Sequence, residues 1–146
     1  MVGDDEEGGR YAQQLQALTK TCGVEQAFRF VGFQRDVPAV LSSLDVLVLP
    51  SHREPLGNIV LEAMAARLLV VATNDGGAAE LIRDRETGFL TLSQQPAVLA
   101  QTILQALHID AAQRECMVTA AQRDVQLWFT VQRQVSQLGS LYRSLR

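Results

Sequence analysis

Residues 45–65 read DVLVLPSHREPLGNIVLEAMA, and they show the structural pattern of the chain in its clearest form. The apolar run from Asp45 to Leu49 is closed by Pro50, which is typical of a strand buried on both faces of a sheet. A loop over residues 51–57 then leads into a helix predicted over residues 58–66. A buried strand followed by a loop and a helix is the repeating unit of α/β proteins.

The same alternation continues on both sides of this segment. Strand and helix in turn favour a parallel sheet with helices on its faces, so we expect a Rossmann-like α/β fold of three layers. We expect one domain over residues 1–146, with a helical tail over about residues 111–146. The other elements predicted are helices over residues 10–20, 38–44, 78–83 and 96–108, and short strands over residues 28–31 and 69–73. Residues 87–90 are expected to form a turn that leads into one more short strand.

Composition excludes several classes of protein. Of the 146 residues 47% are hydrophobic, which excludes a wholly disordered chain, and the net charge of −3 offers no basic surface for general nucleic-acid binding. The longest apolar stretch, residues 68–72, is far shorter than the roughly 20 residues of a membrane-spanning helix. Cys22 and Cys116 lie far apart without metal-ligand spacing, and the acidic N-terminus is unlike a signal peptide, so we expect a reduced, cytoplasmic protein.

The loop after the central strand is the strongest candidate for a ligand site. It crosses the carboxyl edge of the predicted sheet, where ligands bind in open α/β folds. The first amides of the following helix, at Asn58, Ile59 and Val60, have no acceptors within the helix and lie at the positive end of its dipole. Gly57 has no side chain that would keep a phosphate group away from these amides. This arrangement is typical of a phosphate site.

Two carboxylates accompany the loop. Glu54 lies within it, and Glu62 lies one helical turn beyond Asn58, so both are expected to face the same cleft. Carboxylates accept hydrogen bonds from sugar hydroxyls, and a nucleotide sugar has hydroxyls at both ends of a diphosphate. The plainer interpretation stays open here, because glutamates near helix N-termini are common and every α/β protein has such loops.

The segment EPLGNIVLEAMA, with Glu54 and Glu62 separated by seven residues, closely resembles the E-x7-E signature of family 4 (group 1) retaining glycosyltransferases. The resemblance extends over nearly the whole chain and implies the C-terminal, nucleotide-sugar-binding half of a GT-B fold. Further matches in the family's order and spacing are VGF at residues 31–33, DVP at 36–38, DVLVLPS at 45–51, VVAT at 70–73, GG at 76–77 with EL at 80–81, and ETG at 86–88.

The resemblance implies a role for each position of the motif. Glu54 would hold hydroxyls of the donor sugar, and Glu62 would hold the ribose diol of the nucleotide. Leu56–Gly57 matches the family's pair whose backbone approaches the sugar and phosphates, and Asn58–Ile59 would donate amides to the diphosphate. The family normally needs no metal or other cofactor, so a nucleotide diphosphate sugar of unassigned base is the ligand we expect. The wall beside the base would come from Phe33, Gln34, Arg35 and Val37.

The chain departs from the family at several positions. The family usually has a small residue and a proline where this chain has Arg67 and Leu69, and we expect Arg67 either to point to solvent or to strain its turn. Arg85 and Asp5 each stand at a position where the family often has a glycine. The family's first strand of this domain, its Gly-Arg…Lys segment and its N-terminal acceptor domain have no counterpart here, so we expect a truncated domain that is inactive as an isolated chain.

A sheet without its first strand has an open, apolar edge along residues 45–49. We expect either a homodimer that repairs this edge or re-pairing of the strand over residues 28–31.

Other residues permit two interpretations. His52 either reaches the cleft or is solvated, and Gly76–Gly77 with Glu80 either borders the sugar pocket or begins a helix. His108 fits a helix C-terminus.

Trp128 and Phe129 are expected to pack the tail onto the domain. The basic residues of that tail fit a solvated helix face, or a peripheral position at the inner face of the membrane in a full-length enzyme; they are Arg123, Arg133, Arg143 and Arg146.

Two functions from different classes follow. The chain is either the donor-binding domain of a retaining glycosyltransferase, or a non-catalytic nucleotide-binding or assembly module that kept the fold. The intact pair Glu54 and Glu62, together with Gly57, favours the first.

Overall fold

The computed structural model describes residues 10–52 and 55–145, and contacts divide the chain into two compact units, Met1–Val40 and Leu41–Arg146. The first unit contains α1 (Arg10–Thr21) and the 3-10 helix η1 (Glu25–Ala27), and α2 (Val37–Ser42) spans the boundary. The second unit contains β1 (Val46–Leu49), α3 (Asn58–Ala65), β2 (Leu69–Thr73), α4 (Ala78–Leu81), β3 (Phe89–Thr91), α5 (Pro96–His108), α6 (Ala111–Trp128) and α7 (Val131–Ser144).

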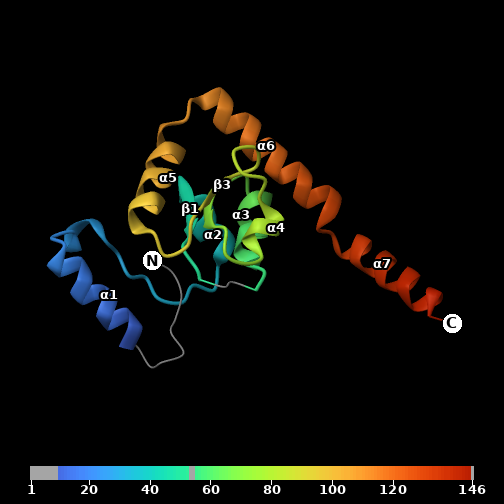
Figure 1. Ribbon diagram of the computed structural model, residues 1–146, viewed down its shortest axis with the longest axis horizontal. Coiled ribbons are helices and arrows are strands. Elements are labelled where there is room, and N and C mark those ends of the chain that lie inside the picture. The colour runs from blue at the N-terminus through green and yellow to red at the C-terminus, as the bar shows by residue number, and fades with distance from the viewer. Residues whose placement is uncertain (1–9, 53–54, 146) are drawn as a thin grey trace. The chain divides into compact units, whose positions relative to one another are not determined.

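A parallel sheet lies at the centre of the second unit, and its described strands have the order β1-β2-β3. Val46 of β1 pairs with Leu69 of β2, and Val71 of β2 pairs with Phe89 of β3. Figure 1 shows α5 on one side of these strands, and α3 and α4 on the other. The predicted α/β architecture with a parallel sheet is therefore confirmed.

β1 and β2 differ in burial. All five residues of β2 are buried, as befits a strand with a neighbour on each side. The four residues of β1 are half-buried, so the prediction that this run is covered on both faces is wrong. Within the described part of the chain β1 pairs with β2 alone, and an edge strand lacks the side chains that a second neighbour would place along its flank.

The strand predicted over residues 28–31 is not formed. Phe28 and Phe30 instead pack on each other with ring centroids 5.1 Å apart, and Val31 is exposed. A strand obtains its hydrogen bonds from a neighbour, and no described strand pairs with this run. Re-pairing of this segment with the sheet, one of the two expected repairs, stays a prediction.

β3 begins at Phe89, directly after a turn, as the sequence predicts. Thr87 is 2% exposed and belongs to the preceding turn, where its hydroxyl oxygen accepts the backbone N–H of Arg83 at 2.9 Å. A buried hydroxyl that completes a turn in this way holds its residue outside the strand.

The core lies on both faces of β2. Val70 and Ala72 alternate with Leu69 and Val71 along the strand, so the two pairs face opposite sides. α3 packs against β1 and β2, and its Met64 has no exposed surface. The other face of the sheet forms a cluster with α5 and α6, made of Leu69, Val71, Phe89, Ala106, Met117 and Val118.

The helical tail is divided into α6 and α7. Asp110 caps α6 by accepting the amide of Gln113 at 2.8 Å, and Thr130 caps α7. Trp128 and Phe129 are 53% and 41% exposed, so the expectation that they pack the tail onto the domain is wrong. Trp128 instead lies beneath the guanidinium of Arg133, 4.4 Å from the ring centroid.

Among the described residues, no helix combines the length and apolar character needed to cross a bilayer.

The two arginines that depart from the family both have left-handed backbone angles. Arg67 has a φ of 60° and Arg85 a φ of 62°, in the region that favours glycine. Arg67 strains its turn, as one of the two alternatives expects, but its side chain is bound rather than solvated. Its guanidinium donates to the hydroxyl of Thr119 at 3.2 Å and forms an ion pair with Glu115 on α6.

Candidate functional site

Gly57 ends the loop after β1 and caps the N-terminus of α3. Its φ of 71° and ψ of 61° are left-handed, which glycine adopts without steric cost. Its carbonyl accepts the N–H of Val60 at 2.8 Å, so the prediction of an unpaired amide at Val60 is wrong. The amides of Asn58 and Ile59 have no hydrogen-bond acceptor among the described residues. Two such amides at the positive end of a helix are suited to an anion.

Gly77 holds the same loop from the other side. A Cβ at this position would lie 2.4 Å from both the Cα of Leu56 and the carbonyl oxygen of Pro55, so only glycine allows the two backbones to touch. Gly77 also caps α4, and its carbonyl accepts the N–H of Glu80 at 3.0 Å. The start of a helix is therefore what the structure shows for Gly77 and Glu80.

Glu62 lies on α3 one turn after Asn58, and both side chains are exposed. No hydrogen bond or ion pair to a described residue occupies the Glu62 carboxylate. Leu56 is 44% exposed and Ile59 is half-buried. Glu54, the other carboxylate of the motif, lies outside the described residues. The structure thus brings Leu56, Gly57, Asn58, Ile59 and Glu62 together at one end of α3.

The residues predicted to form the wall beside the base belong to the first unit. Phe33 is 68% exposed, and the side-chain amide of Gln34 donates to the carbonyl of Val31 at 2.6 Å. Arg35 is exposed, and Val37 begins α2. An exposed aromatic ring beside polar side chains is suited to stacking on a planar group.

His52 joins residues that follow all three described strands. Its imidazole contacts the carboxylate of Asp75, which follows β2, and lies 3.2 Å from the hydroxyl of Ser93, which follows β3. The side-chain amide of Gln94 lies 3.2 Å from His52 Nε2. Of these residues only His52 was expected from the sequence to be a candidate, and Asp75, Ser93 and Gln94 were not. Their position directly after predicted strands is the signal that could have found them, because parallel strands end at one edge.

Metal ligands are absent from the described part of the chain: it contains no group of three or more His, Cys, Asp or Glu side chains placed to hold a metal ion. What the candidate site offers to a ligand is backbone amides and a glutamate.

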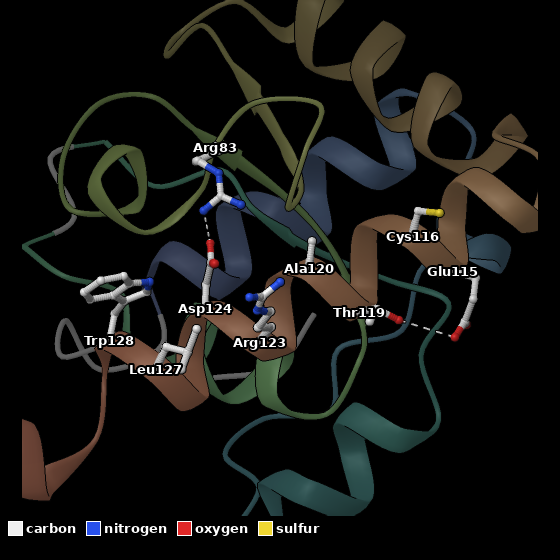
Figure 2. Close-up of a pocket in the computed structure, with 9 residues that line it drawn as sticks. All are labelled: Arg83, Glu115, Cys116, Thr119, Ala120, Arg123, Asp124, Leu127 and Trp128. Atoms are coloured by element: carbon white, nitrogen blue, oxygen red, sulfur yellow. Dashed lines mark hydrogen bonds and ion pairs between the residues drawn. The ribbon is translucent and has the colours of Figure 1, made fainter.

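A hollow of the second unit lies away from this loop, along α6. It has a volume of about 560 Å³. Figure 2 shows Arg83 reaching Asp124 across it, with Trp128 at one end and Glu115 at the other. Its lining residues are Arg83, Glu115, Cys116, Thr119, Ala120, Arg123, Asp124, Leu127 and Trp128.

Ion pairs bind the edges of this hollow. The hydrogen bond to Glu86, followed by the interactions with Asp124, raises the pKa of Arg83 above its usual range. The hydrogen bond from Arg67, together with its charge, lowers the pKa of Glu115. The charges that line the hollow at Arg83, Asp124 and Glu115 are thus paired within the protein, which leaves them less available to a ligand.

Comparison with known proteins places the chain in a family. Residues 1–124 match the family described as glycosyl transferases, group 1. The lipopolysaccharide core biosynthesis mannosyltransferase LpcC of Rhizobium leguminosarum is 33% identical over 135 residues, which make up 92% of this chain and 38% of that protein. The chain therefore spans less than half the length of this relative.

Solved structures agree with the sequence match. HepE of Anabaena, in a crystal structure with UDP and glucose, superposes with a TM-score of 0.89 at 30% identity, over 98% of this chain and 39% of that one. A glycosyltransferase of Rickettsia africae superposes with a TM-score of 0.92 at 25% identity, over 99% of this chain and 38% of its own. Agreement between the residue matches and the superpositions shows that the chain belongs to the group 1 glycosyltransferases, which have the GT-B fold.

Proposed function

We propose that this chain binds a nucleotide diphosphate sugar at the N-terminus of α3 and provides the donor side of a retaining glycosyltransferase. The observation that carries the proposal is the pair of amides at Asn58 and Ile59, one helical turn from the Glu62 carboxylate, all of which lack a hydrogen-bond partner among the described residues. An anion-binding helix end beside an acceptor of hydroxyl hydrogen bonds fits a diphosphate joined to a ribose. HepE, a structural neighbour at 29% identity, was solved with UDP-glucose, which supports a uridine nucleotide as the first donor to test.

Each residue of the motif would have a separate role in binding and leaving-group departure. The amides of Asn58 and Ile59 would stabilise the negative charge that grows on the diphosphate as the glycosidic bond breaks. Gly57 would allow the phosphates to approach the backbone, with Leu56 beside the sugar. Glu62 would accept hydrogen bonds from the ribose diol, and Glu54 from the sugar. Contacts of Phe33, Gln34, Arg35 and Val37 with the base rest on the family resemblance.

Transfer to an acceptor is a proposal for a whole protein of the relatives' length. The relatives are longer than this chain by more than a factor of two, since the chain spans 38% of LpcC and 39% of HepE. We infer that the acceptor is bound by a second domain of such a protein, that the anomeric configuration is retained, and that this chain alone binds donor without turning it over.

Isothermal titration of the 146-residue chain tests the proposal, with UDP, GDP, ADP and their common sugars as ligands. One nucleotide series should bind, and Glu62→Gln should weaken it about 10- to 150-fold, the range of a hydrogen bond to a charged group. Glu80→Gln is the matched control, because Glu80 is an exposed glutamate in the first turn of the neighbouring α4. Equal affinity in Glu62→Gln and wild type, or no binding by any nucleotide, would contradict the proposal.

A further inference from the structure

α7 carries a stripe of apolar side chains that the described part of the chain leaves exposed. None of its residues is buried, and a lone helix of about 12–15 residues is marginal in water. The apolar side chains recur at intervals of three and four residues, so they share one face of the helix. The α7 stripe consists of Val131, Val135, Leu138, Leu141, Tyr142 and Leu145, which are 44–74% exposed. A contiguous apolar surface of this kind marks a place where a partner binds.

The segment that contains the α7 stripe is basic. Residues 125–145 include Arg133 and Arg143 and no aspartate or glutamate, in a chain whose net charge is −3. Neither guanidinium forms an ion pair with a described residue. At about 3.6 residues per turn both arginines fall outside the stripe, on the side of α7 that also holds its serines. α7 is therefore apolar on one side and positively charged on the other, which suits an anionic partner with an apolar interior.

Aromatic residues lie at both ends of the α7 stripe. Trp128 and Phe129 precede α7 and are exposed, and Tyr142 lies in its last turn. The guanidinium of Arg133 lies over the ring of Trp128, which holds the indole beside the first turn of α7. Tryptophan and tyrosine favour the level of lipid head groups, because their rings are apolar with one polar atom. A helix with these three features is typical of one that lies in a membrane interface.

A second copy of α7 fits the stripe less well than a bilayer does. Residues 131, 135, 138, 142 and 145 have the spacing of a coiled-coil seam, but they span only about two heptads, whereas three or four indicate a coiled coil. Pairing would also bring two arginines from each helix together without an acidic residue on either. The charge of the segment therefore favours an anionic surface over another copy of the same basic helix.

We propose that α7 binds the surface of a bilayer that contains anionic phospholipids. The α7 stripe lies at the boundary between head groups and acyl chains, and the lipid phosphates attract Arg133 and Arg143. This role goes beyond the proposed function, because donor binding at the end of α3 uses no residue of α7. It holds the donor-binding domain at a membrane surface.

Co-sedimentation of the 146-residue chain with lipid vesicles tests the proposal. Vesicles of phosphatidylcholine and phosphatidylglycerol in equal amounts should bind the chain about 25-fold more tightly than vesicles of pure phosphatidylcholine, since each arginine near an anionic surface contributes about fivefold. High salt should reduce this preference. The single tryptophan, Trp128, gives a second readout, because its fluorescence should shift to shorter wavelength when the ring enters the head groups.

Variants of α7 separate the apolar contribution from the charge. Leu138→Asp should lower vesicle binding by more than about tenfold, and Leu138→Ala should lower it about tenfold while keeping a strong helix former at that position. Arg143→Gln should lower binding to the anionic vesicles about fivefold and leave binding to the neutral ones unchanged. The same two substitutions at Leu104 are the matched control, because Leu104 is comparably exposed on α5, outside the stripe, and should leave vesicle binding unchanged.

Two results would overturn the proposal: a wild-type chain that stays in the supernatant with both kinds of vesicle, or a Leu138→Asp variant that binds vesicles as tightly as wild type. Equal binding of wild type to neutral and anionic vesicles would overturn the role of the arginines. Light scattering identifies the alternative occupant. A dimer that Leu138→Asp converts into a monomer, in a chain that does not bind vesicles, would show that a second copy covers the stripe. None of these readouts depends on nucleotide binding, so the proposed donor site stands or falls separately.

Discussion

Gly57 and Gly77 both shape the loop in front of α3, but for different physical reasons. Gly57 has left-handed backbone angles, with a φ of 71°, whereas Gly77 has a φ of −61° that any residue adopts. What requires glycine at position 77 is space, because a Cβ would overlap the backbone of Pro55 and Leu56. The sequence shows both as glycines, and only the structure distinguishes conformational freedom from close approach.

Gly77→Ala should therefore displace the loop. The Cβ would lie 2.4 Å from two backbone atoms that cannot rotate away, so we expect a loss of about 1–3 kcal/mol in unfolding free energy and weaker nucleotide binding. Urea denaturation and titration with UDP measure the two effects. Gly139→Ala in α7 is the control, since its Cβ would meet only the flexible end of Arg143 at 3.6 Å and should stabilise the helix by about 0.5–1 kcal/mol. Wild-type stability in Gly77→Ala would show that the loop can move freely.

Arg85→Gly should have the opposite effect on stability, because the strain at position 85 lies in the backbone angles of the arginine. Arg85 has a φ of 62°, which costs a side-chain-bearing residue about 1–2 kcal/mol. Its guanidinium contributes exposed contacts to Phe89, 5.9 Å from the ring centroid, and to Gln105 at 3.2 Å, which are worth less. We expect Arg85→Gly to gain about 0.5–1 kcal/mol of stability by thermal unfolding, and Arg123→Gly within α6 to lose about as much. A loss in Arg85→Gly would mean that the side-chain contacts outweigh the backbone strain.

At the scale of elements, some helices and strands follow from local sequence signals, whereas others depend on a neighbouring strand. β2 runs from Leu69 to Thr73 and α5 from Pro96 to His108, as the sequence predicts, because a continuous apolar run and a proline in a first turn are local signals. Residues 28–31 carry similar apolar residues but form no strand, because a strand depends on a partner that the local sequence does not reveal. The half-burial of β1 has the same cause.

The connection between α3 and β2 is tied to α6 by the ion pair of Arg67 with Glu115, and this pair should make stability depend on pH. The pKa of Glu115 is lowered in the folded protein, so its contribution is present above the unfolded value near 4.5 and is lost as pH falls through the folded value. The melting temperature of Glu115→Gln should thus lie below that of wild type at pH 7, and the gap should close below pH 4.

The same substitution in an Arg67→Met background is the control for this pair. Without the guanidinium, the lowered pKa of Glu115 has lost its largest cause, so Glu115→Gln should produce little pH-dependent difference there. A gap of equal size at pH 7 and below pH 4 would contradict the role of the ion pair.

At the scale of the whole molecule, the exposed flank of β1 predicts self-association. Within the described residues β1 pairs with β2 alone, and an apolar strand edge is a template for a second chain. We expect the isolated chain to form a homodimer at micromolar concentration, with a mass near twice 16.0 kDa by light scattering. A monomer over that concentration range would contradict this prediction.

The candidate site was predictable where one segment builds it. Gly57, Asn58, Ile59 and Glu62 follow one another along the chain, so their meeting at the end of α3 could be inferred from the sequence. The contacts of His52 with Asp75 and Ser93 join three segments, and they depend on which strands are neighbours. The hollow along α6 likewise depends on how α6 packs against distant segments, which local sequence signals do not reveal.

The proposed nucleotide site lies at the end of α3 and not in the hollow along α6. Amide chemical shifts of the labelled chain during titration with UDP distinguish the two positions. We predict that the largest shifts fall on Gly57, Asn58 and Ile59, whose backbones would receive the diphosphate. The single tryptophan, Trp128, lines the hollow, so its indole N–H should stay unshifted. Shifts centred on Trp128 and the neighbouring residues of α6, with none at the end of α3, would contradict the account.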